Sequence, residues 1–303
     1  MGEIIGKAVA FMAVILLGAG LRKIGFLKKE DFHLLSRIVL KITLPAAIVT
    51  NFSSITMENS LLLMILFGLG GNIVMVVLGY LGRIRGTADQ RGFEMINLAG
   101  YNVGNFAMPF IQNFMGPVGL GVTSFFDVGN AVMCTGITFT AASLAVGIGD
   151  KFSLKTCIRS LLSSVPFDTY LIMTVLAVAG ISLPRPVLVF AQTAGGANAF
   201  LSLLMIGIGF EIQLNRETMA ELARLLGMRY VIAVGAAVAC YLFLPFSQEI
   251  RETLTILMLA PVSSICPAFT AGIGGDVGLS SAMNSMSIVV STCLMTAAMI
   301  LIL

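Results

Sequence analysis

The chain has 303 residues, of which 57% are hydrophobic, 11% are charged and none is tryptophan. This balance excludes a soluble globular domain, because there are too few polar side chains to cover the apolar surface. The net charge of +3 does not indicate nucleic acid, and the five cysteines stand singly, so neither a metal site nor a disulfide framework is predicted.

Apolar runs of about 20 residues, the length that crosses a bilayer as a helix, recur along the chain with short polar breaks. They predict an all-α polytopic membrane protein with ten transmembrane helices. The predicted helices are 4–21, 34–55, 60–82, 91–115, 117–147, 160–181, 187–211, 226–245, 249–275 and 277–303. The first is interpreted as a retained span, because it has no basic leader and no small-residue cleavage site.

Most of the basic residues gather on one side of these helices. Fifteen of the eighteen Lys and Arg lie in or beside the connections after the first, third, fifth and seventh helices. Because positive charge marks cytoplasmic loops, we expect a multi-pass protein of the cell membrane with both termini extracytoplasmic. In this assignment Arg229, near the start of the predicted helix 226–245, is counted with the connection before it, and no Lys or Arg lies in the core of a span.

Two segments indicate an internal repeat. Phe110 is followed six residues later by Gly-Pro-Val-Gly-Leu, and Phe269, 159 residues further on, is followed six later by Gly-Asp-Val-Gly-Leu. Each copy precedes the last helix of its half, and halves of five helices enter the membrane in opposite directions. The predicted units are a first inverted repeat at 1–149, a cytoplasmic connection at 150–159 and a second inverted repeat at 160–303.

The fourth and ninth predicted helices contain residues that disfavour a continuous helix. Pro109 follows a run rich in Gly and Asn, and Pro261 and Pro267 bracket Ser263 and Ser264. Proline removes a backbone donor, and backbone groups freed at mid-membrane depth are tolerated only against protein or a wet cavity. We expect half-helices beginning at Pro109 and Pro267, whose positive ends favour an anionic substrate. Simple kinks are the alternative.

Polar residues form one face on each of two other predicted helices. The two sets are Thr123, Asp127, Asn130 and Cys134 in the fifth helix, and Ser280, Asn284, Ser287 and Ser291 in the tenth. Such a face either lines a pathway or joins helices. Asp127 is costly in a span, so it is a candidate for proton coupling, with a structural hydrogen bond to Asn130 as the alternative.

Residues 102–109 resemble the N-x-G-N-x-G-x-P element of the auxin efflux carrier family, with Ala107 in place of the second glycine. Ser164-Val165-Pro166, residues 258–261 with Pro267-Ala268, and Ser291-Thr292 resemble further elements of its bacterial branch. The resemblance implies the bile-acid-symporter-like fold, with helices four and nine crossing at their broken centres. It also implies a carboxylate bound at the crossing; bacterial members are associated with dicarboxylates and plant members with auxin.

The predicted function is secondary active transport of a small organic anion, which we expect to be a carboxylate, by alternating access. A passive anion channel and a non-transporting membrane sensor or partner subunit are the alternatives. The predicted substrate-binding residues are Asn102, Asn105, Pro109, Ser263, Ser264, Pro267 and Ser287, and the coupling candidates are Asp127 and Asn130. No enzymatic activity and no cofactor are expected, and the coupling ion is expected to be H⁺, with Na⁺ left open. The expected partners are the substrate and the lipid bilayer, with a homodimer left open.

Overall fold

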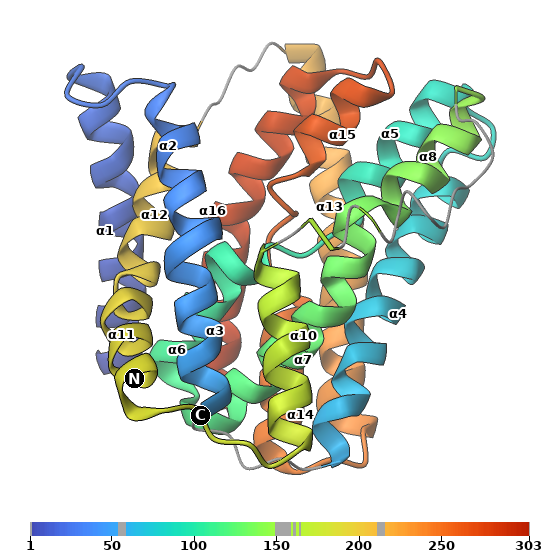
Figure 1. Ribbon diagram of the computed structural model, residues 1–303. Helices are drawn as coiled ribbons and strands as arrows, with labels where there is room; N and C mark the ends of the chain where they lie inside the picture. Colours follow the sequence, from blue (N-terminus) through green and yellow to red (C-terminus); the bar gives the residue numbers. More distant parts are fainter. Residues whose placement is uncertain are drawn as a thin grey trace.

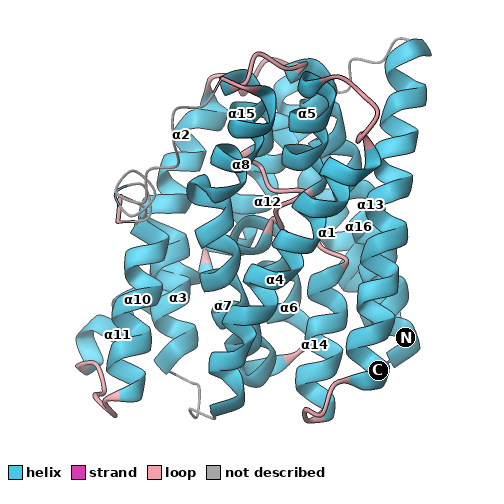
Figure 2. Cartoon of the chain, turned by 90° about the vertical axis from the view of Figure 1, so that its right-hand side faces the viewer, coloured by secondary structure: helices cyan, strands magenta, loops and turns pink. Residues whose placement is uncertain are grey.

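The computed structural model describes residues 2–53, 59–148, 159, 162–163, 165–210 and 216–302. Within these ranges the chain forms helices joined by turns and contains no strand (Figures 1 and 2). Apart from Arg159, the predicted connection at 150–159 lies outside the described residues. The two ends of the chain lie at the same end of the molecule (Figure 1).

The helices fall into two groups by their packing. In the first, which we call the scaffold group, α1 packs along α12, and α3 packs against both α10 and α11. Its members are α1 (Gly2–Lys23), α2 (Asp31–Ile38), η1 (Val39–Thr43), α3 (Leu44–Ser53), α10 (Val165–Val178), α11 (Arg185–Gly196) and α12 (Asn198–Gly209).

The second group, which we call the crossing group, holds the remaining helices. In it α4 packs on α7, α5 packs on α4 and α8, and α13 packs on α14. Its members are α4 (Asn59–Gly82), α5 (Ala88–Leu98), η2 (Val103–Ala107), α6 (Met108–Phe114), α7 (Gly116–Val132), η3 (Met133–Ile137), α8 (Thr138–Val146), α13 (Arg216–Phe243), α14 (Gln248–Met258), α15 (Cys266–Gly272) and α16 (Val277–Ile302).

Among the described residues, six helices are long and apolar enough to cross a membrane by themselves. They are Ile5–Lys23, Asp31–Ser53, Ser60–Gly82, Arg185–Gly209, Thr218–Phe243 and Val277–Ile302. Of the other four predicted spans, the fourth and the ninth are divided by unwound backbone, before α6 and before α15. The structure therefore supports an all-helical membrane protein with fewer uninterrupted spans than predicted.

The predicted helix at 226–245 is wrong at its start, since α13 begins ten residues earlier, at Arg216. Its first turns are polar, so hydropathy alone places them in a loop. Charged partners from α4 and α5 hold them instead: Glu221 accepts from Arg83 at 2.5 Å, and Arg224 donates to Glu221 at 2.7 Å and also to Glu94. Arg229 consequently lies well inside a helix.

The first break is also displaced from its predicted position. α5 ends at Leu98, Gly100 takes a left-handed conformation with φ of 79°, and the helix resumes at Val103. Pro109 lies inside this second piece, because the π-helical turn η2 just before it relaxes the regular bonding pattern that proline would disrupt. The second break runs from Leu259 to Ile265. Loops reach the middle of the molecule in Figure 2.

Glycine allows the closest helix contact in the crossing group. A Cβ added to Gly68 on α4 would lie 2.0 Å from the carbonyl oxygen of Phe126 on α7, and one added to Gly129 would lie 2.0 Å from that of Ile65. Backbone atoms cannot yield as a flexible side chain can, so both positions require glycine. The contact fixes α7, and with it Asp127 and Asn130, against α4.

We predict that Gly68→Ala lowers the midpoint of thermal unfolding in detergent by several degrees. Overpacking costs about 1–3 kcal/mol, and ~1 kcal/mol shifts the midpoint of a chain of this size by roughly 2–4 °C. Gly70→Ala on the same helix is the matched control, because its Cβ would meet nothing within 4 Å. Equal midpoints for the two variants would contradict the assignment.

Candidate functional site

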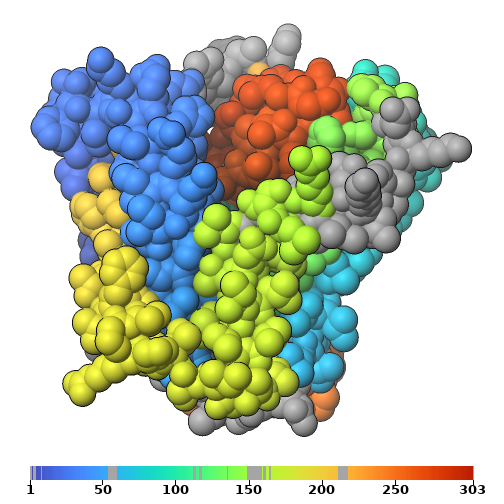
Figure 3. All heavy atoms as spheres, in the orientation of Figure 1, coloured from blue at the N-terminus to red at the C-terminus, as the bar shows by residue number. Residues whose placement is uncertain are grey.

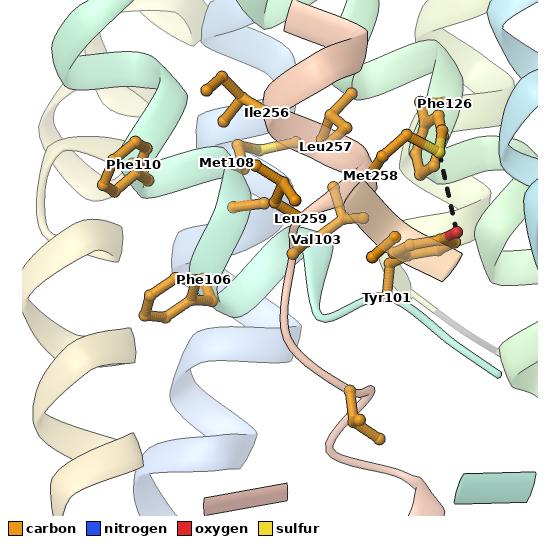
Figure 4. Close-up of a cluster of buried hydrophobic side chains, with 14 of the residues drawn as sticks. Tyr101, Val103, Phe106, Met108, Phe110, Phe126, Ile256, Leu257, Met258 and Leu259 are labelled. Atoms are coloured by element: carbon orange, nitrogen blue, oxygen red, sulfur yellow. Dashed lines mark hydrogen bonds between the residues drawn. The ribbon is translucent and has the colours of Figure 1, made fainter. Parts of the chain in front are cut away.

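The two breaks lie against each other at the centre of the crossing group. The backbone N–H of Asn102 donates to the carbonyl oxygen of Pro261 at 2.9 Å. Figure 4 shows the segment from Tyr101 to Phe110 beside the segment from Ile256 to Leu259, with the Tyr101 hydroxyl 3.8 Å from the Met258 sulfur. The resemblance implied this crossing of broken centres.

Side chains from α4 and α7 replace the helical hydrogen bonds of the first break. Asn72 accepts from the Gly100 N–H at 2.7 Å. The Asn130 side chain accepts from the Tyr101 N–H at 3.1 Å and donates to the Tyr101 carbonyl at 2.9 Å, and it also donates to Asp127 at 2.9 Å. The unwound segment is therefore held in one conformation.

The polar face of α16 performs the same task for the second break. Ser287 accepts from the Val262 N–H at 3.1 Å, and Asn284 donates to the Val262 carbonyl at 3.0 Å. Ser291 donates to the Leu259 carbonyl at 2.6 Å. Ser287, a predicted substrate-binding residue, is fully buried, and its hydroxyl is occupied by these protein groups.

A buried arginine joins the two breaks, which the sequence did not predict. Arg229 of α13 is 0% exposed and donates to the carbonyls of Leu98, Gly100 and Ala260, the last two at 3.0 Å. Its guanidinium lies 5.3 Å from the centre of the Tyr101 ring. The expectation that no Lys or Arg lies in the core of a span is therefore wrong; a helix beginning at Arg216 rather than at 226 would have placed Arg229 away from the helix end.

A cavity of about 320 Å³ opens beside the crossing, between the two helix groups. Three predicted site residues line it: Asn102, Ser264 and Pro267. The remaining lining residues are Lys29, Phe32, His33, Met205, Ile206, Gly209, Ala268, Ser281, Asn284, Ser285 and Ile288. In Figure 3 the blue segment that contains Lys29 and Phe32 faces the orange-red segment of α15 and α16.

Asn102 is the polar group best placed to meet a ligand in this cavity. Its side chain is only 4% exposed, and its amide nitrogen has no hydrogen-bond partner among the described residues. The carbonyl oxygen of Asn105 is likewise buried without a described partner, but Asn105, Pro109 and Ser263 do not line the cavity. The structure thus brings three of the seven predicted residues to one cavity and leaves the other four in the supporting packing.

The two groups touch closely away from the cavity mouth. Phe11 of α1 packs edge-on against Phe110 at 5.9 Å between ring centres, and Phe52 of α3 packs on Phe125 at 5.1 Å. The Tyr170 hydroxyl of α10 donates to Asp127 at 3.0 Å. The cavity lining includes Lys29, Phe32 and His33 from the α1–α2 connection and α2, together with Asn102 at the crossing.

Two broken helices thus meet at a buried polar crossing beside a cavity between the two helix groups. Residues 4–148 match the family described as membrane transport protein, which confirms the predicted resemblance to auxin efflux carriers. An uncharacterized transporter of Methanothermobacter thermautotrophicus is similar over 269 residues at 21% identity, covering 87% of this chain and 86% of that protein. The family match covers just under half of the chain, and both comparisons show similarity to membrane transport proteins.

We predict that Asn130→Ala destabilises the protein strongly, because it leaves the N–H and C=O of Tyr101 unpaired, at about 1–3 kcal/mol for each group. Thr123→Val is the matched control on the same helix, since the Thr123 hydroxyl donates only to the Gly119 carbonyl of its own helix in the described structure. Thermal unfolding in detergent measures both variants. A comparable midpoint for the two would argue against this role of Asn130.

Proposed function

We propose that the protein is a secondary active carrier of a small organic anion, a carboxylate, and that it works by alternating access around the crossing of the two broken helices. The single observation that carries the proposal is the cavity between the helix groups, lined at the crossing by Asn102, whose buried amide nitrogen has no partner among the described residues. Such a cavity, at the interface of two packed units, is where broken-helix carriers bind their substrates.

The lining favours an anion. It offers donors from Asn102 and from hydroxyls such as those of Ser264 and Ser281, with Lys29 and His33 towards the mouth, and no carboxylate among the described lining residues. Arg229 lies at the same crossing, but its terminal nitrogens are engaged by carbonyl groups. A carboxylate would therefore be held mainly by neutral donors.

We further propose the ten-span, inverted-repeat architecture in the cell membrane, with both termini extracytoplasmic. Three observations support it. Each broken helix is stabilised by a polar face of the helix that follows it, through Asn130 in one half and Ser287 in the other. The ends of the chain lie together (Figure 1). The α1–α2 connection, which carries Lys28 and Lys29, lies at the opposite end.

We favour a carrier over a passive channel because the contacts between Phe11 and Phe110 and between Phe52 and Phe125 pack the two groups together outside the cavity lining. A channel needs a continuous path, whereas a carrier closes one side while the other is open. Trans-stimulation of uptake in proteoliposomes separates the two classes, and ligand binding without flux would favour a sensor or partner subunit.

We predict that Asn102→Ala weakens binding of the substrate carboxylate roughly ten- to hundredfold, the value of one hydrogen bond to a charged group. The ligand is found first by thermal stabilisation of the wild-type protein with a panel of mono- and dicarboxylates at two pH values, with and without Na⁺. The concentration dependence of uptake in proteoliposomes then measures the loss of affinity in Asn102→Ala.

Asn198→Ala is the matched control, because Asn198 is a buried asparagine of the scaffold group outside the cavity lining and also has an amide nitrogen without a described partner. It should retain uptake. Wild-type uptake by a well-folded Asn102→Ala protein would refute the assignment of the site.

We propose Asp127 as the coupling residue, and its hydrogen bond to Tyr170 of the scaffold group supports this, because the bond must break if the groups move apart. Asp127→Asn, which preserves size, should abolish uptake driven by a pH gradient while substrate exchange at equal pH persists. Unchanged gradient-driven uptake would favour the structural role of Asp127 instead.

A further inference from the structure

The crossing collects helix C-terminal ends as well as unwound backbone. α5 ends at Leu98 and α14 ends at Met258, so the carbonyls of Leu98, Gly100 and Ala260 converge on one buried position. A helix C-terminus carries a partial charge of about −0.5. Two such ends together approach one full negative charge, which must be balanced at a buried position.

In carriers built from broken helices, carbonyl groups at such ends commonly coordinate the coupling cation. In this protein a side chain fills that position. Arg229 is fully buried and donates to all three carbonyls, and the face of the Tyr101 ring supports its guanidinium at 5.3 Å. A guanidinium remains protonated in proteins and presents its donors in a fixed planar fork, so it supplies a permanent positive charge.

We propose that Arg229 is the built-in cation of the crossing: it takes the place that Na⁺ would occupy between the two helix ends, so that the carrier binds no coupling cation there. The statement that this cation would be a coupling ion rests on the proposed carrier function, whereas the balancing of the helix ends by Arg229 does not. Any ion coupling is then left to a group outside these carbonyls, such as Asp127.

The test needs no substrate, so its outcome is independent of whether the carboxylate proposal holds. Thermal unfolding in detergent is measured for the wild-type protein and Arg229→Ala in sodium, potassium and choline chloride at equal ionic strength, each with and without low millimolar guanidinium chloride. We expect the wild-type midpoint to be the same in all three salts. Arg229→Ala should unfold several degrees lower and be raised by guanidinium or by Na⁺ relative to choline.

Arg22→Ala is the matched control. Arg22 also donates to helix-end carbonyls, those of Ile208 at 2.8 Å and Phe210 at 3.2 Å, but in the scaffold group and only partly buried. Because water can replace Arg22 at this open position, no cation-specific recovery is expected. If Arg229→Ala is not recovered from membranes, Arg229→Lys is measured in its place. The midpoint of thermal unfolding of Arg229→Lys should lie below that of the wild-type protein. It should not respond to guanidinium, because the lysine ammonium fills the position.

Three results would overturn the proposal. They are an Arg229 variant as stable as the wild-type protein, an Arg229→Ala protein that responds to no cation, and a Na⁺-specific rise of equal size in the wild-type and Arg229→Ala proteins. The first would mean that the helix ends need no balancing charge. The other two would mean that the position of Arg229 is not a cation site.

Discussion

Backbone groups in the middle of a bilayer have no water to bond, so a helix that breaks there must find a protein partner for each group it frees. Here the two breaks provide one such partner for each other, through the hydrogen bond from the Asn102 N–H to the Pro261 carbonyl. Side chains from three places bond to further backbone groups of the breaks. They are Asn72 on α4 with Asn130 on α7, Ser287 on the polar face of α16, and Arg229 on α13. The packing of the crossing group follows from this requirement.

One consequence concerns which parts of the molecule can move. Within the crossing group, charged and amide side chains tie every element at the crossing to its neighbours, so it should behave as one body. Between the groups the described contacts are mostly aromatic and apolar, such as Phe52 on Phe125, with the Tyr170–Asp127 bond as a polar exception. Apolar surfaces can slide at small cost, whereas a buried polar network has few alternative arrangements. Motion between the two groups, rather than within the crossing group, is therefore the expected route for the proposed alternating access.

Much of this organisation could be predicted from the sequence, because lipid imposes strong rules on composition. Apolar runs located most helices, and glycine with asparagine indicated that the fourth was broken. Proline was a poorer guide: Pro109 was expected to begin the half-helix, but Gly100 and its tertiary partners set the break, and a π-helical turn accommodates the proline. The three-to-four spacing found the polar faces correctly, yet it could not decide whether Ser287 faces a ligand or a backbone, since its partner Val262 lies on another element. Arg229 was missed because hydropathy began the helix too late, at 226 instead of Arg216, and its carbonyl partners lie as far as 131 residues away.

The position of Arg229 also changes how anion binding should be understood. A free cation in the cavity would attract a carboxylate strongly, and a buried ion pair of that kind is slow to separate. With the terminal nitrogens of the guanidinium on carbonyls, the cavity presents instead the neutral donors of Asn102 and Ser264, whose hydrogen bonds to a carboxylate are individually modest. The proposed carrier must release its substrate on the far side of the membrane, so binding by a few neutral donors suits transport better than an ion pair would. Preference for an anion would then come from the donors of Asn102 and Ser264 and from Lys29 in the lining, because the charge of Arg229 is balanced by the helix ends.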